Sequence, residues 1–204
     1  MAVKTLVLGP LATNCYIYTD DKTGKMAVVD PAFQCAQLLS LKPDYIFITH
    51  AHADHIMAAA SLKALSGAKV VCTKAEAVRM QSSRDSLYDA IGIYSDEFVP
   101  VDADVIVCDG DEILVGDTAF KIMQTPGHTD GSVCFITDGI IFSGDTMFCG
   151  SCGRTDFPSG NLQQMLESFR RLFALEGDYT VYSGHGEATT LSVERKTNPL
   201  VRLI

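Results

Sequence analysis

Short apolar runs separated by turn residues make up the first part of the chain. The pattern is typical of β-strands, and the turn signal at Asp20–Gly24 joins two of the runs closely enough for an antiparallel pair. We predict three successive strands in an antiparallel meander, at Val3–Leu8, Cys15–Thr19 and Met26–Asp30. A short helix near Gln34–Ser40 follows the meander.

The next part of the chain alternates between strand and helix patterns. Tyr45–Thr49 is an apolar, β-prone run, and the alanine-rich Ile56–Leu65 after it favours a helix that Gly67 can end. A further strand pattern at Ala68–Cys72 precedes a helical pattern at Lys74–Gln81. This alternation predicts a sheet with helices on its outer face.

The segment Ser82–Pro100 lacks a clean period. It carries aromatic and acidic residues, namely Tyr88, Tyr94, Asp85, Asp89, Asp96 and Glu97. Such a segment fits an active-site lid and fits an ordinary surface insertion equally well, so both interpretations stay open.

The second half returns to short strands and ends in helices. We predict strands at Val105–Val107, Glu112–Val115, Thr118–Gln124, Ser132–Thr137, Ile140–Ser143 and Thr180–Ser183. A helix beginning at Asn161 has its apolar residues on one stripe, which we assign to the core: Leu162, Met165, Leu166, Phe169, Leu172 and Phe173. A last helix, Thr190–Lys196, must end near Pro199. We predict an α/β fold in which two sheets pack face to face with helices outside.

Composition limits the possible functions. The 204 residues are 47% hydrophobic and 20% charged, with no linker-like stretch, so we predict one domain over residues 1–204. No run approaches membrane-spanning length, and the apolar N-terminus is too short for a signal peptide, which predicts a cytoplasmic protein. The net charge of −9 argues against nucleic-acid binding and favours a small-molecule substrate.

Cysteine usage points to reduced thiols. The seven cysteines are odd in number and are spread through apolar segments, so no disulfide framework is predicted. Cys149 and Cys152 have the CxxC spacing of zinc and redox motifs, but no second pair accompanies them. We interpret this pair as structural or incidental.

Four potential metal ligands fall within the turn Thr49–His55. His50, His52, Asp54 and His55 follow an apolar strand and precede a helix pattern. Residues two apart in an extended segment face the same way, so His50 and His52 can bind one ion, and the turn sends the other two side chains elsewhere. A HxHxDH run suits zinc or iron and has little packing value. Two adjacent metals are predicted.

The remaining histidines repeat one local pattern. His128 and His185 each follow a strand and a glycine, and Asp145 does the same after Ile140–Ser143. Loops at one end of a sheet can bring such residues together. All five histidines thus belong to one candidate site.

These motifs resemble the metallo-β-lactamase superfamily along the whole chain, which implies a four-layer αββα sandwich of two mixed sheets flanked by helices. By this resemblance, His50, His52 and His128 would hold one divalent metal, Asp54, His55 and His185 a second, and Asp145 would bridge both. Zinc is the expected metal, with iron or manganese as alternatives. Asp145 stands where β-lactamases of this fold place a cysteine, which argues against antibiotic hydrolysis. The chain is more similar to compact glyoxalase II-like thioester hydrolases.

One further segment carries the same resemblance. Gly153–Phe157 is similar to a stretch shared by glyoxalase II-like proteins and persulfide dioxygenases, and within it Arg154 and Asp156 would contact substrate or pin the loop. Full-length glyoxalase II has an added C-terminal helical region that helps to bind glutathione, whereas only Thr190–Ile204 is left here for such a region. We therefore expect loose specificity for the thiol.

The expected reaction is thioester cleavage by water activated between two metals, with Asp54 orienting that water. A thiolate leaving group needs little general-acid help. A mononuclear non-haem iron persulfide dioxygenase is the main alternative, because two histidines and a carboxylate can hold its iron. A lactonase and a non-catalytic metal-binding module are less favoured. The sequence does not fix the oligomeric state.

Overall fold

The computed structural model describes residues 2–92 and 97–204, and the Tyr94 and Asp96 of the predicted lid or insertion lie outside them. Its strands form two sheets of six. The N-terminal sheet has the order β1-β2-β3-β4-β5-β6, antiparallel up to β3 and parallel from β3 to β6. Its strands are β1 Ala2–Leu8, β2 Thr13–Thr19, β3 Met26–Val29, β4 Tyr45–Phe47, β5 Lys69–Thr73 and β6 Val105–Val107. The predicted antiparallel meander is confirmed.

The C-terminal sheet has the order β12-β11-β10-β9-β8-β7 and is also mixed. Only β10 and β11 run parallel, because α6 Leu162–Phe173 lies between them in the chain as a crossover. The strands are β7 Glu112–Val115, β8 Thr118–Gln124, β9 Val133–Thr137, β10 Ile140–Gly144, β11 Thr180–Ser183 and β12 Thr189–Thr190.

A buried hydrophobic layer joins the two sheets. Strand residues facing inward from both sheets make one buried cluster, in which the rings of Phe47 and Phe135 stack with centroids 4.4 Å apart. Tyr18 meets Phe120 edge to face in the same layer, at 4.8 Å. Aromatic pairs of this kind add to the stabilisation from burial alone. The prediction that two sheets pack face to face is confirmed.

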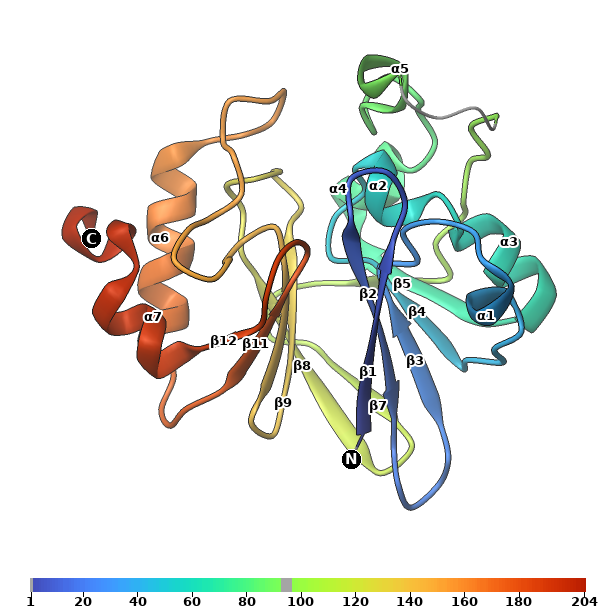
Figure 1. Cartoon of the computed structure of the whole chain (residues 1–204), viewed down its shortest axis with the longest axis horizontal. Coiled ribbons are helices and arrows are strands. Elements are labelled where there is room, and N and C mark those ends of the chain that lie inside the picture. The colour runs from blue at the N-terminus through green and yellow to red at the C-terminus, as the bar shows by residue number, and fades with distance from the viewer. Residues whose placement is uncertain (1, 93–96) are drawn as a thin grey trace.

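Helices cover the outer faces of both sheets (Figure 1). α1 Ala36–Leu39 and α3 Ala59–Ser66 bury Leu38 and Leu62 against the N-terminal sheet. On the other side, α6 and α7 Leu191–Thr197 pack on the C-terminal sheet, and the short 3-10 helix η1 Pro199–Leu203 follows α7. The result is the predicted four-layer αββα sandwich.

The apolar stripe of α6 is mostly core. Met165, Phe169 and Leu172 are buried against the C-terminal sheet, but Leu162 is 52% exposed. Assigning Leu162 to the core was wrong, because it is the first helical residue after the N-cap Asn161 and has no neighbouring layer to enter.

Two other local predictions need correction. The helix predicted at Ile56–Leu65 is two helices, α2 Ala53–Ile56 and α3, because the Ala58 N–H donates to the Pro31 carbonyl 2.9 Å away instead of continuing α2. The sequence also gave no warning of β12, and Thr190 caps α7 rather than belonging to it. Helix α4 Lys74–Arg79 is confirmed, two residues shorter than predicted.

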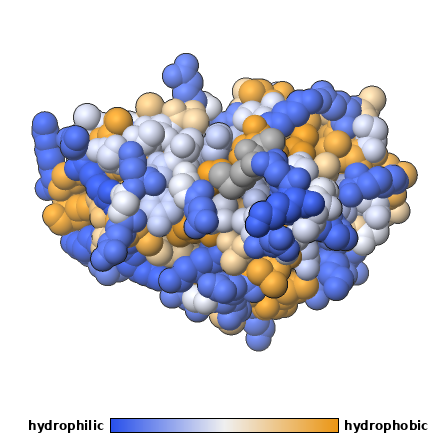
Figure 2. All heavy atoms as spheres, turned by 90° about the horizontal axis from the view of Figure 1, so that it is seen from below, coloured by the Kyte–Doolittle hydropathy of each residue, from blue (hydrophilic) through white to orange (hydrophobic). Residues whose placement is uncertain are grey.

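Among the described residues, no helix combines the length and the apolar character needed to cross a bilayer. The face seen from below, which carries the turns between β2 and β3 and between β7 and β8, has separate hydrophobic areas among hydrophilic groups (Figure 2).

Candidate metal centre

The candidate ligands all lie on loops at one end of the two sheets. His50 follows β4, and His52 is the N-cap residue of α2, which itself carries Asp54 and His55. The remaining three residues follow strands of the C-terminal sheet, where β8, β10 and β11 lead to His128, Asp145 and His185 respectively. Residues up to 135 positions apart, from His50 to His185, thereby reach one site because the sheets pack face to face.

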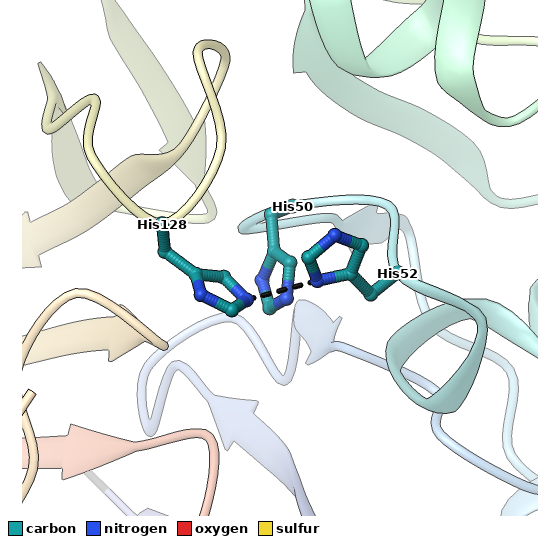
Figure 3. Close-up of side chains that lie close together, drawn as sticks. All are labelled: His50, His52 and His128. Atoms are coloured by element: carbon teal, nitrogen blue, oxygen red, sulfur yellow. Dashed lines mark hydrogen bonds between the residues drawn. The ribbon is translucent and has the colours of Figure 1, made fainter. Parts of the chain in front are cut away.

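A first group consists of His50, His52 and His128. One ligand atom from each lies within 4.8 Å of the other two, and all three side chains are buried. Their rings converge from two loops, and the His52 Nδ1 lies 2.9 Å from the His128 Nε2 (Figure 3). Three imidazole nitrogens at this spacing match the donor set of a zinc or iron site.

A second group consists of Asp54, His55 and His185, whose ligand atoms also lie within 4.8 Å of one another. The His185 Nε2 is 3.2 Å from the Asp54 Oδ2, and the His55 Nε2 is 3.5 Å from the same oxygen. Thr13 donates its hydroxyl to this oxygen at 2.8 Å.

Asp145 lies between the two groups. Its Oδ2 is 3.5 Å from the His128 Nε2 of the first group and 3.7 Å from the His185 Nε2 of the second, and its Oδ1 is 3.4 Å from the His55 Nε2. Gly184 makes this approach possible, since a Cβ there would lie 2.1 Å from the Asp145 Oδ1. The position is the one expected of a bridging carboxylate.

Oxygen atoms outside the two groups bind one ring nitrogen each of His128, His55 and His50. The His128 Nδ1 donates to the Arg154 carbonyl at 2.7 Å, and the His55 Nδ1 donates to the Asp30 Oδ2 at 3.0 Å, because neither oxygen can donate. The His50 Nδ1 lies 3.2 Å from the Thr49 hydroxyl, which itself donates to Asp30. Such partners are typical of metal-binding histidines.

Among the described residues, four buried side-chain atoms make no hydrogen bond. They are the Nε2 atoms of His50, His52 and His55 and the Oδ1 of Asp145. Buried polar atoms without a hydrogen bond are rare and need an explanation. All four atoms belong to the two groups or to the residue between them, so this donor set fits bound cations.

Charge distinguishes the first group. Burial, together with the neighbouring His55, lowers the pKa of His50 well below its usual value. Burial and the neighbouring His128 lower the pKa of His52 to about 3. These imidazoles are therefore neutral near pH 7 and offer lone pairs.

In the second group, the pKa values of both histidines are raised. Burial alone would lower the pKa of His55, but the carboxylates of Asp54 and Asp145 raise it well above the usual value. The pKa of His185 is also raised, because its hydrogen bond to Asp54 and the charge of Asp145 outweigh burial. Although burial opposes it, His55 in turn lowers the pKa of both carboxyl groups. The carboxylates thus require positive charge beside them.

A cavity of about 400 Å³ opens onto these residues. Its polar base is His52, Asp54, His128, Asp145 and His185, and its walls include the apolar side chains of Leu11, Leu87, Phe148 and Phe157. Leu87 has φ +63°, an uncommon conformation for a branched residue and one that clusters at functional sites. It belongs to Ser82–Pro100, so part of that segment does line the cavity, just before α5 Tyr88–Ile91.

Arg154, which lines this cavity, pairs with Asp156. The guanidinium donates twice to the Asp156 carboxylate, at 2.7 and 2.8 Å, and lies 3.9 Å from the centroid of the Phe157 ring. Both charged side chains are more than half exposed. The contacts are those of a pinned loop, and Arg154 also lines the cavity.

Sequence reasoning missed three supporting residues. Asp30 was assigned to a strand end, where its buried carboxylate in fact accepts from the N–H and hydroxyl of Thr49 as well as from His55. Because these contacts occupy its oxygens, we assign Asp30 to support and not to ligation, although its side chain also lies close to His50 and His55. Thr13 and the buried Glu76 had no local signal, since the bonds of Thr13 to Asp54 and of Glu76 to Ala51 join residues 41 and 25 positions apart.

Comparison with known proteins identifies the class. Residues 8–185 match the family model of the metallo-beta-lactamase superfamily. The chain therefore belongs to this superfamily, which together with the histidine groups indicates a metal-dependent hydrolase. The four-layer fold agrees with this assignment.

Individual similarities are more specific. The chain is 29% identical to the hydroxyacylglutathione hydrolase GloC of Haemophilus influenzae, over 98% of both chains. Among solved structures, it is similar to the BLEG-1 B3 metallo-beta-lactamase (TM-score 0.88, 28% identity, 98% of this chain and 99% of that one). It is also similar to TTHA1623 in a di-iron-bound form, with a TM-score of 0.85 and 31% identity over 96% of this chain and 98% of that one. ETHE1 from Myxococcus xanthus has a TM-score of 0.78 and 31% identity over 98% of this chain and 84% of its own.

These neighbours do not agree on one activity. One is named a hydroxyacylglutathione hydrolase and another a B3 metallo-beta-lactamase. The expectation against antibiotic hydrolysis therefore stays a prediction, and a β-lactam belongs in any substrate panel.

Proposed function

We propose that this protein is a binuclear metal-dependent hydrolase that cleaves small acyl thioesters of the S-acylglutathione type. The observation that carries the proposal is the pair of ligand groups, with Asp145 within 3.7 Å of both, at the base of one cavity. The proposed ligands are His50, His52 and His128 for one cation and Asp54, His55 and His185 for the other, with Asp145 shared. Zinc is the favoured metal, and a similar protein in a di-iron-bound form makes iron a candidate, with manganese as a further alternative.

Bound divalent cations would supply Lewis acidity for a carbonyl and lower the pKa of a bound water. The chain's own residues hold the geometry. Thr13 fixes the Asp54 carboxylate at the cavity base, where it can accept a hydrogen bond from the attacking water and orient it. Asp30 and the Arg154 carbonyl hold the rings of His55 and His128.

The cavity walls suit a thioester. Leu11, Leu87, Phe148 and Phe157 exclude water from one side of the bound substrate. The departing thiolate, from a thiol of pKa near 8.5, needs little protonation, so no dedicated general acid is required. This agrees with the relative named hydroxyacylglutathione hydrolase.

Recognition of the thiol portion is expected to be loose. Among the described lining residues of the cavity, Arg154 is the cationic side chain, and Asp156 already neutralises it. The carboxylates of a glutathione moiety would therefore compete with Asp156 for this guanidinium. Thioesters of several different thiols should therefore be hydrolysed.

A second candidate is a mononuclear iron oxygenase acting on a persulfide. Asp54, His55 and His185 form a set of two histidines and one carboxylate, which is the donor set of many non-haem iron oxygenases. Either reaction is consistent with a small-molecule substrate.

Anaerobic assay separates the two candidates. The zinc form should hydrolyse small acyl thioesters at the same rate with and without oxygen, in a panel that also contains a lactone, a β-lactam and a glutathione persulfide. If the zinc form is inert toward all thioesters while the iron form consumes oxygen with the persulfide, the hydrolase proposal is wrong and the oxygenase replaces it.

A further inference from the structure

Glu76 is a fully buried carboxylate outside the proposed ligand set. It lies on α4 and is 0% exposed. Burying an ionised carboxylate is costly unless its oxygens are well bonded.

One oxygen of Glu76 holds the first histidine loop. The Oε2 accepts the backbone N–H of Ala51 at 2.7 Å. Ala51 is the residue between His50 and His52, so this single bond acts on the backbone that orients both rings.

The other oxygen holds the opposite loop. The Oε1 accepts the hydroxyl of Thr129 at 2.6 Å, and Thr129 directly follows His128. The loop is close enough that a Cβ on Gly131 would lie 2.5 Å from the same oxygen. In Figure 3 these are the two loops from which the three rings converge.

Arg79 completes the arrangement and holds Glu76 in place. Its guanidinium donates to Glu76 through Nη1 and reaches Asp130 and Ser159 through Nη2, at 2.7 and 2.8 Å. Hydrogen bonds between charged groups are stronger than those between neutral groups. Arg79 lies on α4 together with Glu76, so it ties the Glu76 carboxylate to Asp130 and Ser159 in the C-terminal half of the chain.

The second group depends on other residues. Asp54 is held by Thr13 and His55 by Asp30, and the Ala53 N–H donates to the Ser86 carbonyl. Among the described residues, the hydrogen bonds of Glu76 go to Ala51, Thr129 and Arg79 and to none of these residues.

We infer that Glu76, locked by Arg79, is a positioning residue that sets the spacing of His50 and His52 relative to His128. The inference rests on the metal arrangement of the proposed function. It predicts that disturbing Glu76 weakens metal binding at the first group selectively, by about 10- to 100-fold, as loss of a supporting partner typically does.

Two single-site backgrounds make the test selective. His185→Ala leaves the first group to bind metal, and His128→Ala leaves the second. Glu76→Gln is introduced into each background. The glutamine NH2 group would face either the Ala51 N–H or the Thr129 and Arg79 donors, so at least one hydrogen bond of Glu76 would be lost. Zinc affinity is measured by competition with a chelator on the full-length protein, and circular dichroism confirms folding.

Glu194→Gln is the matched control. Glu194 is also 0% exposed and accepts from Thr189, Gly150 and Asn198, but it lies on α7 and makes none of the contacts above. We expect Glu76→Gln to weaken zinc binding at least tenfold with His185→Ala and less than threefold with His128→Ala, and Glu194→Gln to change neither by more than threefold. Equal effects of Glu76→Gln in both backgrounds, or no effect in either, overturn the inference.

A milder pair guards against loss of folding. Thr129→Val removes one hydroxyl that Glu76 accepts, and Thr129→Ser keeps it. Weaker zinc binding at the first group in the valine variant than in the serine variant supports the inference, and equal binding refutes it. If the unmodified protein binds no metal at all, the proposed function fails instead, which separates the two outcomes.

Discussion

The two ligand groups differ in charge, although a single cavity serves both. The first, His50, His52 and His128, contains three imidazoles and no carboxylate, and the pKa of His50 and of His52 is lowered. The second contains Asp54, and its histidines have raised pKa values because carboxylates surround them.

The two groups also differ in how they are held in place. The first group depends on buried contacts to its loops, above all those of Glu76. The second is held by direct contacts to its ligands from Thr13 and Asp30. Asp145 is the residue common to both, so substitutions can be ordered by how many groups they reach.

The largest effect is expected for Asp145→Ala. Because the carboxylate lies within 3.7 Å of histidines from both groups, its loss should weaken the binding of both metal ions. Lewis-acid stabilisation is worth several kcal/mol, so thioesterase activity should fall at least about 10³-fold. Metal content by elemental analysis and kcat/KM are the measurements, with the exposed Asp138→Ala as control. Selective loss of one ion would contradict the bridging role.

His185→Ala should remove one metal and leave the other. His185 lies in the second group alone, apart from its approach to Asp145. The matched variant His128→Ala should empty the first group instead. Metal equivalents per chain after dialysis measure both. Loss of both ions from the His185 variant would contradict the assignment of two separate ligand groups.

A smaller effect is expected from Thr13→Val. The variant removes the hydroxyl that donates to Asp54 and keeps the shape of the side chain. Zinc affinity of the second group should fall about tenfold, at the lower end for a lost supporting contact. Thr13→Ser retains the hydroxyl and should behave as the unmodified protein. A chelator competition in the His128→Ala background gives the values, and a tighter or unchanged affinity in the valine variant would disprove the role.

No effect on metal content is expected from alkylating the accessible thiols. Cys108 and Cys149 are exposed, whereas burial raises the pKa of Cys134 to about 11 and that of Cys72 to about 12. A higher pKa means less thiolate at pH 8, so the buried thiols should stay unlabelled by iodoacetamide. Mass spectrometry and elemental analysis check both points. Metal release on labelling Cys149 would assign the CxxC pair to a metal site.

The candidate ligands could be found in the sequence, whereas the residues that support them could not. His128, Asp145 and His185 could be found because each lies a few residues after a strand, and strand ends of packed sheets meet. Thr13 and Glu76 could not be found, since their contacts join residues 41 and 53 positions apart that no local pattern marks. The break between α2 and α3 was missed for a similar reason, because a tertiary bond to Pro31 overrides an alanine-rich helical pattern.

Two cations are proposed to bind at one end of the two sheets, and metal stoichiometry tests this most directly. Purified protein is stripped with a chelator, reconstituted separately with excess zinc, iron or manganese, desalted and analysed for metal per chain. The seven proposed ligands exceed what one tetrahedral ion needs, so close to two equivalents are predicted for at least one of these metals. A reproducible ceiling of one equivalent with all three metals would contradict the binuclear assignment.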